Sequence, residues 1–208
     1  MIEYFVKYHE KFLDALLEHV EIVLVTLLIS LVLASFIMVI TLKSKKLNNI
    51  IVQLFGAIYS IPSLALFALL IPIMGLGQDT AILVLVVYNQ FLLVRNISAG
   101  IYGVDESITE AATGMGMNWL QVLFKIQIPL AFPMIMAGIR LAVISTIGIA
   151  TIAATINAGG LGAILFQGLG SMNTYKIVWG TILCAVIAFV ADAGLKKVEK
   201  IVNRKVNR

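Results

Sequence analysis

The feature that most limits how this chain can fold is a run of 21 residues, 22–42, without a single charged side chain. A helix rises about 1.5 Å per residue, so this run reaches roughly 30 Å, the thickness of the hydrocarbon core of a bilayer. Four further apolar runs cover about residues 50–74, 80–102, 129–157 and 176–195. Only 12% of the 208 residues are charged, too few to cover a soluble globular domain. We therefore predict an all-α, polytopic membrane protein with about five transmembrane helices, forming a single domain over residues 1–208.

The basic side chains between these runs predict how the chain is oriented. With five spans, the connecting segments alternate between the two sides of the membrane, and ten Lys and Arg fall on one side against three on the other. The ten are Lys43, Lys45, Lys46, Lys125, Lys196, Lys197, Lys200, Arg204, Lys205 and Arg208, and the three are Lys7, Lys11 and Lys176. Because cytoplasmic segments carry the excess of Lys and Arg, we expect the C-terminus, with its basic tail 196–208, in the cytoplasm and the N-terminus outside.

Residues 1–21 precede the first apolar run and carry a helical pattern of their own. Leu13, Leu16, Leu17 and Val20 recur at helical spacing, with acidic side chains between them. One interpretation is an external amphipathic segment that lies on the membrane surface, and the other is an extension of the first span into solvent. Neither interpretation assigns chemistry to the segment.

The residue patterns that the sequence lacks argue against several classes of function. The single cysteine, Cys184, and the two histidines, His9 and His19, form no metal-binding motif, so we predict no metal site. No nucleophile and base are paired within the apolar runs, so we predict no catalytic residues and regard an intramembrane enzyme as a weak alternative. No acidic residue lies deep in a span, which argues against a proton-coupled transporter or a cation channel. The net charge of +4 lies mostly in the ends and short loops, a distribution that indicates membrane orientation and not nucleic-acid binding.

The longest polar interruption, residues 103–128, predicts two short helices joined by a turn. Ser107 and Glu110 have the spacing of a capping box, in which each side chain satisfies a free backbone N–H, so we expect the first helix to begin there. Gly114 and Gly116 tolerate positive φ, which ends that helix and lets the chain turn sharply.

The second half of this segment predicts the second helix and a surface for a partner. Asn118 and Gln121 can cap a helix that runs towards Pro129. We expect Ala111 and Ala112 to be exposed, and their small side chains would let a partner approach closely. A well-capped connection between two spans is the alternative.

The spacing of residues in this segment resembles a known motif. Glu110-Ala111-Ala112 is followed after three residues by Gly116, after nine more by Ile126, and then by Ile128-Pro129. This pattern resembles the EAA motif, EAA-x3-G-x9-I-x-LP, of the permease subunits of bacterial ABC importers. Ile128 stands where leucine is usual, a replacement of similar volume.

Shorter stretches are similar to the osmoprotectant branch of these permeases, whose members import glycine betaine, carnitine, choline or related compatible solutes. They are Ser60-Ile61-Pro62-Ser63-Leu64-Ala65-Leu66, Gly75-Leu76-Gly77, Leu93-Val94-Arg95-Asn96, Pro133-Met134-Ile135-Met136-Ala137-Gly138-Ile139-Arg140 and Gly159-Gly160-Leu161-Gly162.

The resemblance implies a subunit without catalytic residues that works with several partners. It implies a second permease, identical or similar, an extracellular solute-binding protein and an ATP-binding subunit in the bacterial plasma membrane. Because the chain has no phosphate loop, ATP and Mg²⁺ are expected on that ATP-binding subunit. The resemblance assigns the coupling contact to Glu110, Ala111, Ala112, Gly114, Gly116, Ile126 and Pro129.

Polar residues within the spans are candidates for the solute pathway. They are Tyr59, Ser60 and Ser63 in the second run and Tyr88, Asn89 and Gln90 in the third, although ordinary hydrogen bonds between helices explain each of them equally well. Arg140 falls about eleven residues into the fourth run, where a charge costs roughly 2.5–3.5 kcal/mol. It is either a gate or pathway residue or a structural arginine that binds helix carbonyls.

Small side chains recur every four residues in the fourth run, at Thr146, Ala150, Ala154 and Ala158, and predict close packing against another helix. The spans offer hydroxyls, amides and aromatic rings but no deep carboxylate, which suits passage of a small zwitterion or quaternary amine. An amino-acid or methionine ABC permease is the alternative within the class, and an ATP-independent channel or transporter is the alternative outside it.

Overall fold

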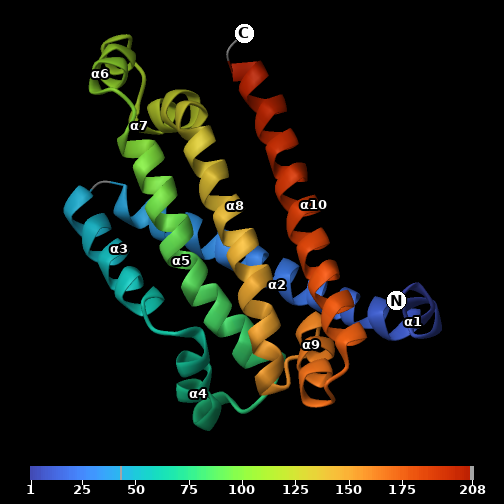
Figure 1. Cartoon of the computed structure of the whole chain (residues 1–208). Coiled ribbons are helices and arrows are strands. Elements are labelled where there is room, and N and C mark those ends of the chain that lie inside the picture. Colours follow the sequence, from blue (N-terminus) through green and yellow to red (C-terminus); the bar gives the residue numbers. More distant parts are fainter. Residues whose placement is uncertain (43, 207–208) are drawn as a thin grey trace.

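The computed structural model describes residues 1–42 and 44–206, and every regular element within that part of the chain is a helix (Figure 1). The elements are α1 Ile2–Lys7, α2 His9–Thr41, α3 Lys45–Tyr59, α4 Ser63–Met74, α5 Gln78–Tyr102, α6 Glu106–Gly114, α7 Trp119–Val122, the π-helical turn η1 Leu123–Gln127, α8 Ile128–Ala153, the 3₁₀ turn η2 Ala154–Ile156, α9 Leu161–Gly170 and α10 Thr174–Val206. This confirms the predicted all-α membrane fold. The predicted contributions of Lys43 and Arg208 to the basic side, and of the Lys205 side chain, lie outside the described part.

Helices long and apolar enough to cross a bilayer correspond to four of the five predicted spans. They are α2, α5, the segment Trp119–Ile156 and α10, and the bent pair α3–α4 makes a fifth crossing if it counts as one span. In Figure 1, α5, α8 and α10 lie alongside one another, with α2 behind them. The end of α10 and the α6–α7 connection lie towards one end of this bundle, and α4, α9 and α1 lie towards the other.

The first span begins much earlier than its uncharged run. Helix α2 is continuous from His9 to Thr41, so residues 9–21 extend the span, and only α1 is set off by a break at Tyr8. Phe12 and Ala15 of this extension are buried in one cluster with Leu161 of α9. The extension is therefore part of the bundle and not a separate helix on a surface.

The second apolar run is not one straight helix, contrary to the prediction. Helices α3 and α4 meet at a bend of 92° across Ser60, Ile61 and Pro62. A proline disfavours helical backbone in the residue before it, so Ile61 leaves the helix and Pro62 becomes the N-cap of α4. The sequence contained this signal in Pro62, but the apolar pattern conceals a change of direction.

The small-residue stripe of the fourth run is shorter than predicted. Thr146 and Ala150 are buried in α8, but the α-helix ends at Ala153 and the next turn is a 3₁₀ turn. Ala154 and Ala158 therefore do not continue the four-residue spacing. Ala158 is still buried, within a cluster around Phe67 of α4, and Ala154 is half-buried.

Helix α5 is the centre of the bundle, with its most extensive contacts to α8 and α2. The α5–α8 contact depends on two glycines, because a methyl group on Gly138 would lie 2.6 Å from Cβ of Asn96, and one on Gly100 would lie 2.9 Å from Cβ of Met134. In a membrane, where lipid is as apolar as the core, such close approach supplies the van der Waals attraction that holds helices together.

Candidate coupling surface and polar residues of the spans

The first helix of the 103–128 segment begins at Glu106 and is capped by Asp105. The Asp105 carboxylate accepts hydrogen bonds from the backbone N–H of Ser107 at 2.9 Å and from its hydroxyl at 2.8 Å. These bonds lower the pKa of Asp105 below its usual value, so the cap is ionised at neutral pH. The predicted capping box of Ser107 and Glu110 is therefore wrong: Asp105, two residues earlier, supplies the acceptor, and Glu110 is left free to face outwards.

The turn after α6 requires only one of the two glycines named for it. Gly116 has φ +87°, which a side chain rarely adopts, whereas Gly114 is the last residue of the helix and has no positive φ. The turn closes through Gly116 N–H, which donates to the carbonyl of Thr113 at 2.9 Å, and Met117 N–H, which donates to that of Ala112 at 3.2 Å. This closure fixes the angle between α6 and α7.

The second helix starts as predicted. Asn118 accepts from the backbone N–H of Gln121 at 2.9 Å, and the Gln121 side chain accepts from the N–H of Asn118 at 2.9 Å. This reciprocal capping box opens α7, which continues through η1 into α8. Pro129 has no N–H to donate to the carbonyl four residues earlier, and the π-helical turn containing Ile126 lies directly before it.

The two alanines of this segment differ in exposure. Ala111 is exposed, as predicted, but Ala112 is only 1% exposed and anchors α6 to the rest of the molecule. Beside Ala111, Glu110 also faces solvent. The outward face of α6 therefore presents an acidic side chain next to a small one.

Large apolar side chains on and next to α6 and α7 are also exposed. We call them the α6–α7 patch: Ile108, Met115, Trp119, Leu120 and Phe124, which are between 43% and 74% exposed. Well-capped helices that leave such side chains uncovered are characteristic of a protein-binding surface. The sequence predicted a helix running from Asn118 towards Pro129 but not this patch.

Two of the pathway candidates form interhelical hydrogen bonds inside the bundle. Asn89 donates from Nδ2 to Thr146 Oγ1 at 2.9 Å and to Ser30 Oγ at 3.3 Å, which joins α5 to α8 and α2. Gln90 donates from Nε2 to the carbonyls of Val86 and Ser30. Both side chains are buried, so within this subunit their geometry is that of ordinary interhelical bonding.

The other pathway candidates gather at the bend between α3 and α4. The Tyr88 hydroxyl donates to the carbonyl of Ile61, and the Tyr88 and Tyr59 rings lie 5.3 Å apart. Ser60 is exposed at the bend, and Tyr59 and Ser63 are half-buried beside it. The break in the helix thus brings three of the predicted pathway residues to one accessible place.

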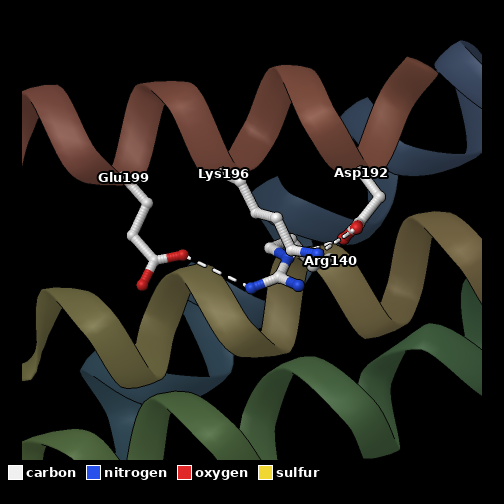
Figure 2. A network of polar contacts seen from close by, with 4 residues as sticks. All are labelled: Arg140, Asp192, Lys196 and Glu199. Atoms are coloured by element: carbon white, nitrogen blue, oxygen red, sulfur yellow. Dashed lines mark hydrogen bonds and ion pairs between the residues drawn. The ribbon is translucent and has the colours of Figure 1, made fainter. Parts of the chain in front are cut away.

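Arg140 is held by acidic side chains of α10 (Figure 2). Its Nε lies 2.7 Å from Asp192 Oδ1, its Nη1 lies 3.5 Å from Glu199 Oε2, and Lys196 Nζ lies 2.7 Å from Asp192 Oδ2. The prediction of helix carbonyls as partners is therefore corrected to carboxylates. An arginine in the fourth run and an acidic residue, Asp192, near the end of the fifth were the sequence signal for this pair.

Two polar contacts made by the first three spans were not predicted from the sequence. Asn48 donates from Nδ2 to Ser98 Oγ at 2.7 Å, which joins α3 to α5. Glu18 Oε2 accepts from the backbone N–H of Gly160 at 2.9 Å, which joins α2 to the start of α9. Gly160 has φ +71°, and Gly159-Gly160 was the only signal for this contact.

Residues 26–208 match the family described as binding-protein-dependent transport system inner membrane component, and the chain belongs to this family. The carnitine transport permease protein OpuCD of Listeria monocytogenes is 41% identical over 167 residues, covering 80% of this chain and 75% of that protein. The glycine betaine/carnitine/choline transport system permease protein OpuCB of Bacillus subtilis is 34% identical over 188 residues, covering 90% and 87%. A chain of the MetNI methionine ABC transporter in an inward-facing conformation shares the fold, with a TM-score of 0.84 at 20% identity over 94% of this chain and 98% of that chain.

Proposed function

We propose that this subunit forms half of the translocation pathway of an ATP-driven importer for a compatible solute such as glycine betaine, carnitine or choline. The relatives named for these solutes cover most of the chain at 34–41% identity. The nature of the spans agrees with such a solute, because the described middle portions of the spans contain polar and aromatic side chains but no acidic group to hold a cation tightly. Selection of the solute then belongs to an extracellular solute-binding protein, whose aromatic rings attract a quaternary ammonium.

The α6–α7 patch is the proposed contact with the ATP-binding subunit, which binds ATP and Mg²⁺. The observation that carries this proposal is the exposed apolar patch around Glu110 and Ala111, on helices that Asp105 and Asn118 cap. Capped helices resist deformation. A movement of the ATP-binding subunit against α6 and α7 is therefore transmitted to α5 and α8, to which these helices are joined along the chain. Ile126 and Pro129 form the junction between this surface and α8.

The proposal also includes the orientation of the chain in the membrane and a second permease that forms the other half of the pathway. The C-terminus and the α6–α7 patch lie on the cytoplasmic side and the N-terminus lies outside, as the positive-inside rule predicts. A second permease, identical or similar, faces this one, because alternating access requires a cavity between two bundles. The accessible bend at Ser60 is the part of this chain that we assign to that cavity.

Uptake by intact cells tests the proposed solute. Cells with and without this gene are compared under salt stress for accumulation of labelled glycine betaine, carnitine and choline, with methionine and histidine as controls. The proposal predicts that loss of the gene abolishes uptake of at least one quaternary amine and spares both amino acids. Loss of amino-acid uptake with normal quaternary-amine uptake would instead assign the chain to an amino-acid importer.

A further inference from the structure

A cationic groove lies between α8 and α10, beside the Arg140 network. It has a volume of about 630 Å³ and is lined by Arg140, Lys196, Glu199, Lys200, Asn203 and Arg204. Figure 2 shows three of its lining residues, Arg140, Lys196 and Glu199, together with Asp192. The groove is open on one side, so a ligand can enter it without any rearrangement of the helices.

The charges in and beside this groove do not balance. Arg140 and Lys196 are matched by the carboxylates of Asp192 and Glu199. Lys200 and Arg204 have no ion pair among the described residues, so two cations are left without an acidic partner. An anion with one or two negative charges would balance these two cations.

The groove lies at the level where the apolar part of the bundle ends. Gly138 packs directly on Asn96, and Arg140 and Arg95 each lie within two residues of this contact, so the two arginines mark one level on α8 and α5. On α10, Lys196 belongs to the same level through its contact with Asp192. The apolar part of α10 ends at Lys196, and basic side chains at the end of an apolar stretch mark a membrane–water interface.

The exposed face of α10 joins this groove to an apolar strip. At spacings of three or four residues, the helix presents Ile182, Val186, Phe189 and Ala193, followed by Lys196, Lys200 and Arg204. Phe189 is 75% exposed and Val186 is 50% exposed, so this strip is uncovered in the subunit. From Lys196 the strip runs roughly 20 Å back to Ile182, at about 1.5 Å per residue.

We propose that this groove binds the headgroup of an anionic phospholipid. The phosphate contacts Lys200 and Arg204, and an acyl chain lies along the strip from Ala193 to Ile182. Basic pockets between helices at the membrane surface select anionic headgroups, whereas a zwitterionic headgroup gains little from two unpaired cations. With the proposed orientation, the lipid belongs to the cytoplasmic leaflet. The site is independent of which solute the importer carries.

Lipid titration of the purified full-length chain in detergent tests this site. Binding of phosphatidylglycerol and of phosphatidylcholine with the same acyl chains is measured by native mass spectrometry. The Lys200→Gln/Arg204→Gln variant should bind phosphatidylglycerol about 25-fold more weakly, since each basic residue contributes roughly fivefold near an anionic lipid. Its binding of phosphatidylcholine should not change.

Two matched variants make the result decisive. Lys46→Gln/Lys197→Gln removes the same charge, one lysine from the same end of α10, but from outside the groove, and should keep wild-type affinity for phosphatidylglycerol. Lys200→Arg/Arg204→Lys keeps both charges and should also bind normally. Equal losses in the two glutamine variants would show diffuse attraction and overturn the site. Equal binding of both lipids by the wild type, or displacement of phosphatidylglycerol by millimolar inorganic phosphate, would overturn the lipid assignment.

Discussion

Arg140 shows how one charge is accommodated at the edge of an apolar bundle. The Arg140 and Asp192 side chains are only 26% and 20% exposed, and their 2.7 Å contact joins α8 to α10. Removing Asp192 leaves Arg140 with only the longer contact to Glu199, and removing Arg140 leaves Asp192 with Lys196 alone. We expect Arg140→Gln and Asp192→Asn each to lower the free energy of unfolding, by less than for a fully buried pair because water screens the contact.

A double-mutant cycle measured by denaturant unfolding of the purified chain checks this pair. The loss in the double variant Arg140→Gln/Asp192→Asn should be smaller than the sum of the two single losses, because each single variant already removes the same contact. Glu199→Gln is the matched control, since Glu199 lies at 3.5 Å and should cost less than Asp192→Asn. Strictly additive losses at Arg140 and Asp192 would mean that the pair contributes nothing to the α8–α10 contact.

At the scale of elements, the bundle depends on how closely α5 and α8 approach. A methyl group on Gly138 would lie 2.6 Å from Cβ of Asn96, whereas one on Gly148, also in α8, would meet nothing within 4 Å. Gly138→Ala should therefore force the two helices apart and cost about 1–3 kcal/mol of unfolding free energy. Gly148→Ala should be neutral or stabilise by roughly 0.5–1 kcal/mol, because alanine favours a helix.

The free energies of unfolding of Gly138→Ala and Gly148→Ala are measured under the same conditions and compared. Both substitutions add one methyl group to the same helix, so a difference between them reports the contact and not helix propensity. Similar unfolding free energies for Gly138→Ala and Gly148→Ala would contradict the close approach of α5 and α8 described for the wild type.

Most elements could be predicted from the sequence because apolar length is a direct signal in a membrane. The structure confirms the first, third and fifth runs as helices α2, α5 and α10, although α2 begins at His9 and α10 continues to Val206. The bend at Pro62 could not be read from apolarity, which is unchanged on both sides of it. The early start of α2 depends on burial of Phe12 against α9, a tertiary contact that no local pattern contains.

The candidate coupling surface was predicted in part for the same reason. The box of Asn118 and Gln121 is local and was correct, and the cap at Asp105 was missed because Ser107 offered a competing local pattern. Ala112 was expected to be exposed, but its burial depends on where α6 folds back, which the sequence does not reveal. The α6–α7 patch is likewise a property of the folded chain, since the exposure of its members depends on how α6 and α7 fold against the bundle.

At the scale of the whole molecule, the two ends of the bundle lie on opposite sides of the membrane in the proposed orientation. Two exposed residues provide reporters, Lys197 near the end of α10 and Met172 between α9 and α10. On a Cys184→Ala background, an impermeant thiol reagent should label Met172→Cys in intact cells and label Lys197→Cys only after permeabilisation. Labelling of Lys197→Cys in intact cells would reverse the proposed orientation.

The central claim is that the α6–α7 surface couples this subunit to an ATPase. Glu110→Lys reverses a charge on the outward face of α6, and Gly116→Val places a β-branched residue where φ is +87° and would strain the turn. Glu3→Lys, the same charge change at the other end of the molecule, is the control. All three variants should insert into the membrane normally, because none of these residues lies within the apolar runs.

Solute-stimulated ATP hydrolysis by the native complex, purified from its membrane and reconstituted in liposomes, is the measurement that tests this claim most directly. Glu110→Lys and Gly116→Val should each lower the stimulated rate about tenfold or more, the effect of roughly 1.4 kcal/mol at the coupling contact. The control should hydrolyse ATP at the wild-type rate. If Glu110→Lys and Gly116→Val both hydrolyse ATP and transport solute at wild-type rates, the coupling assignment is wrong.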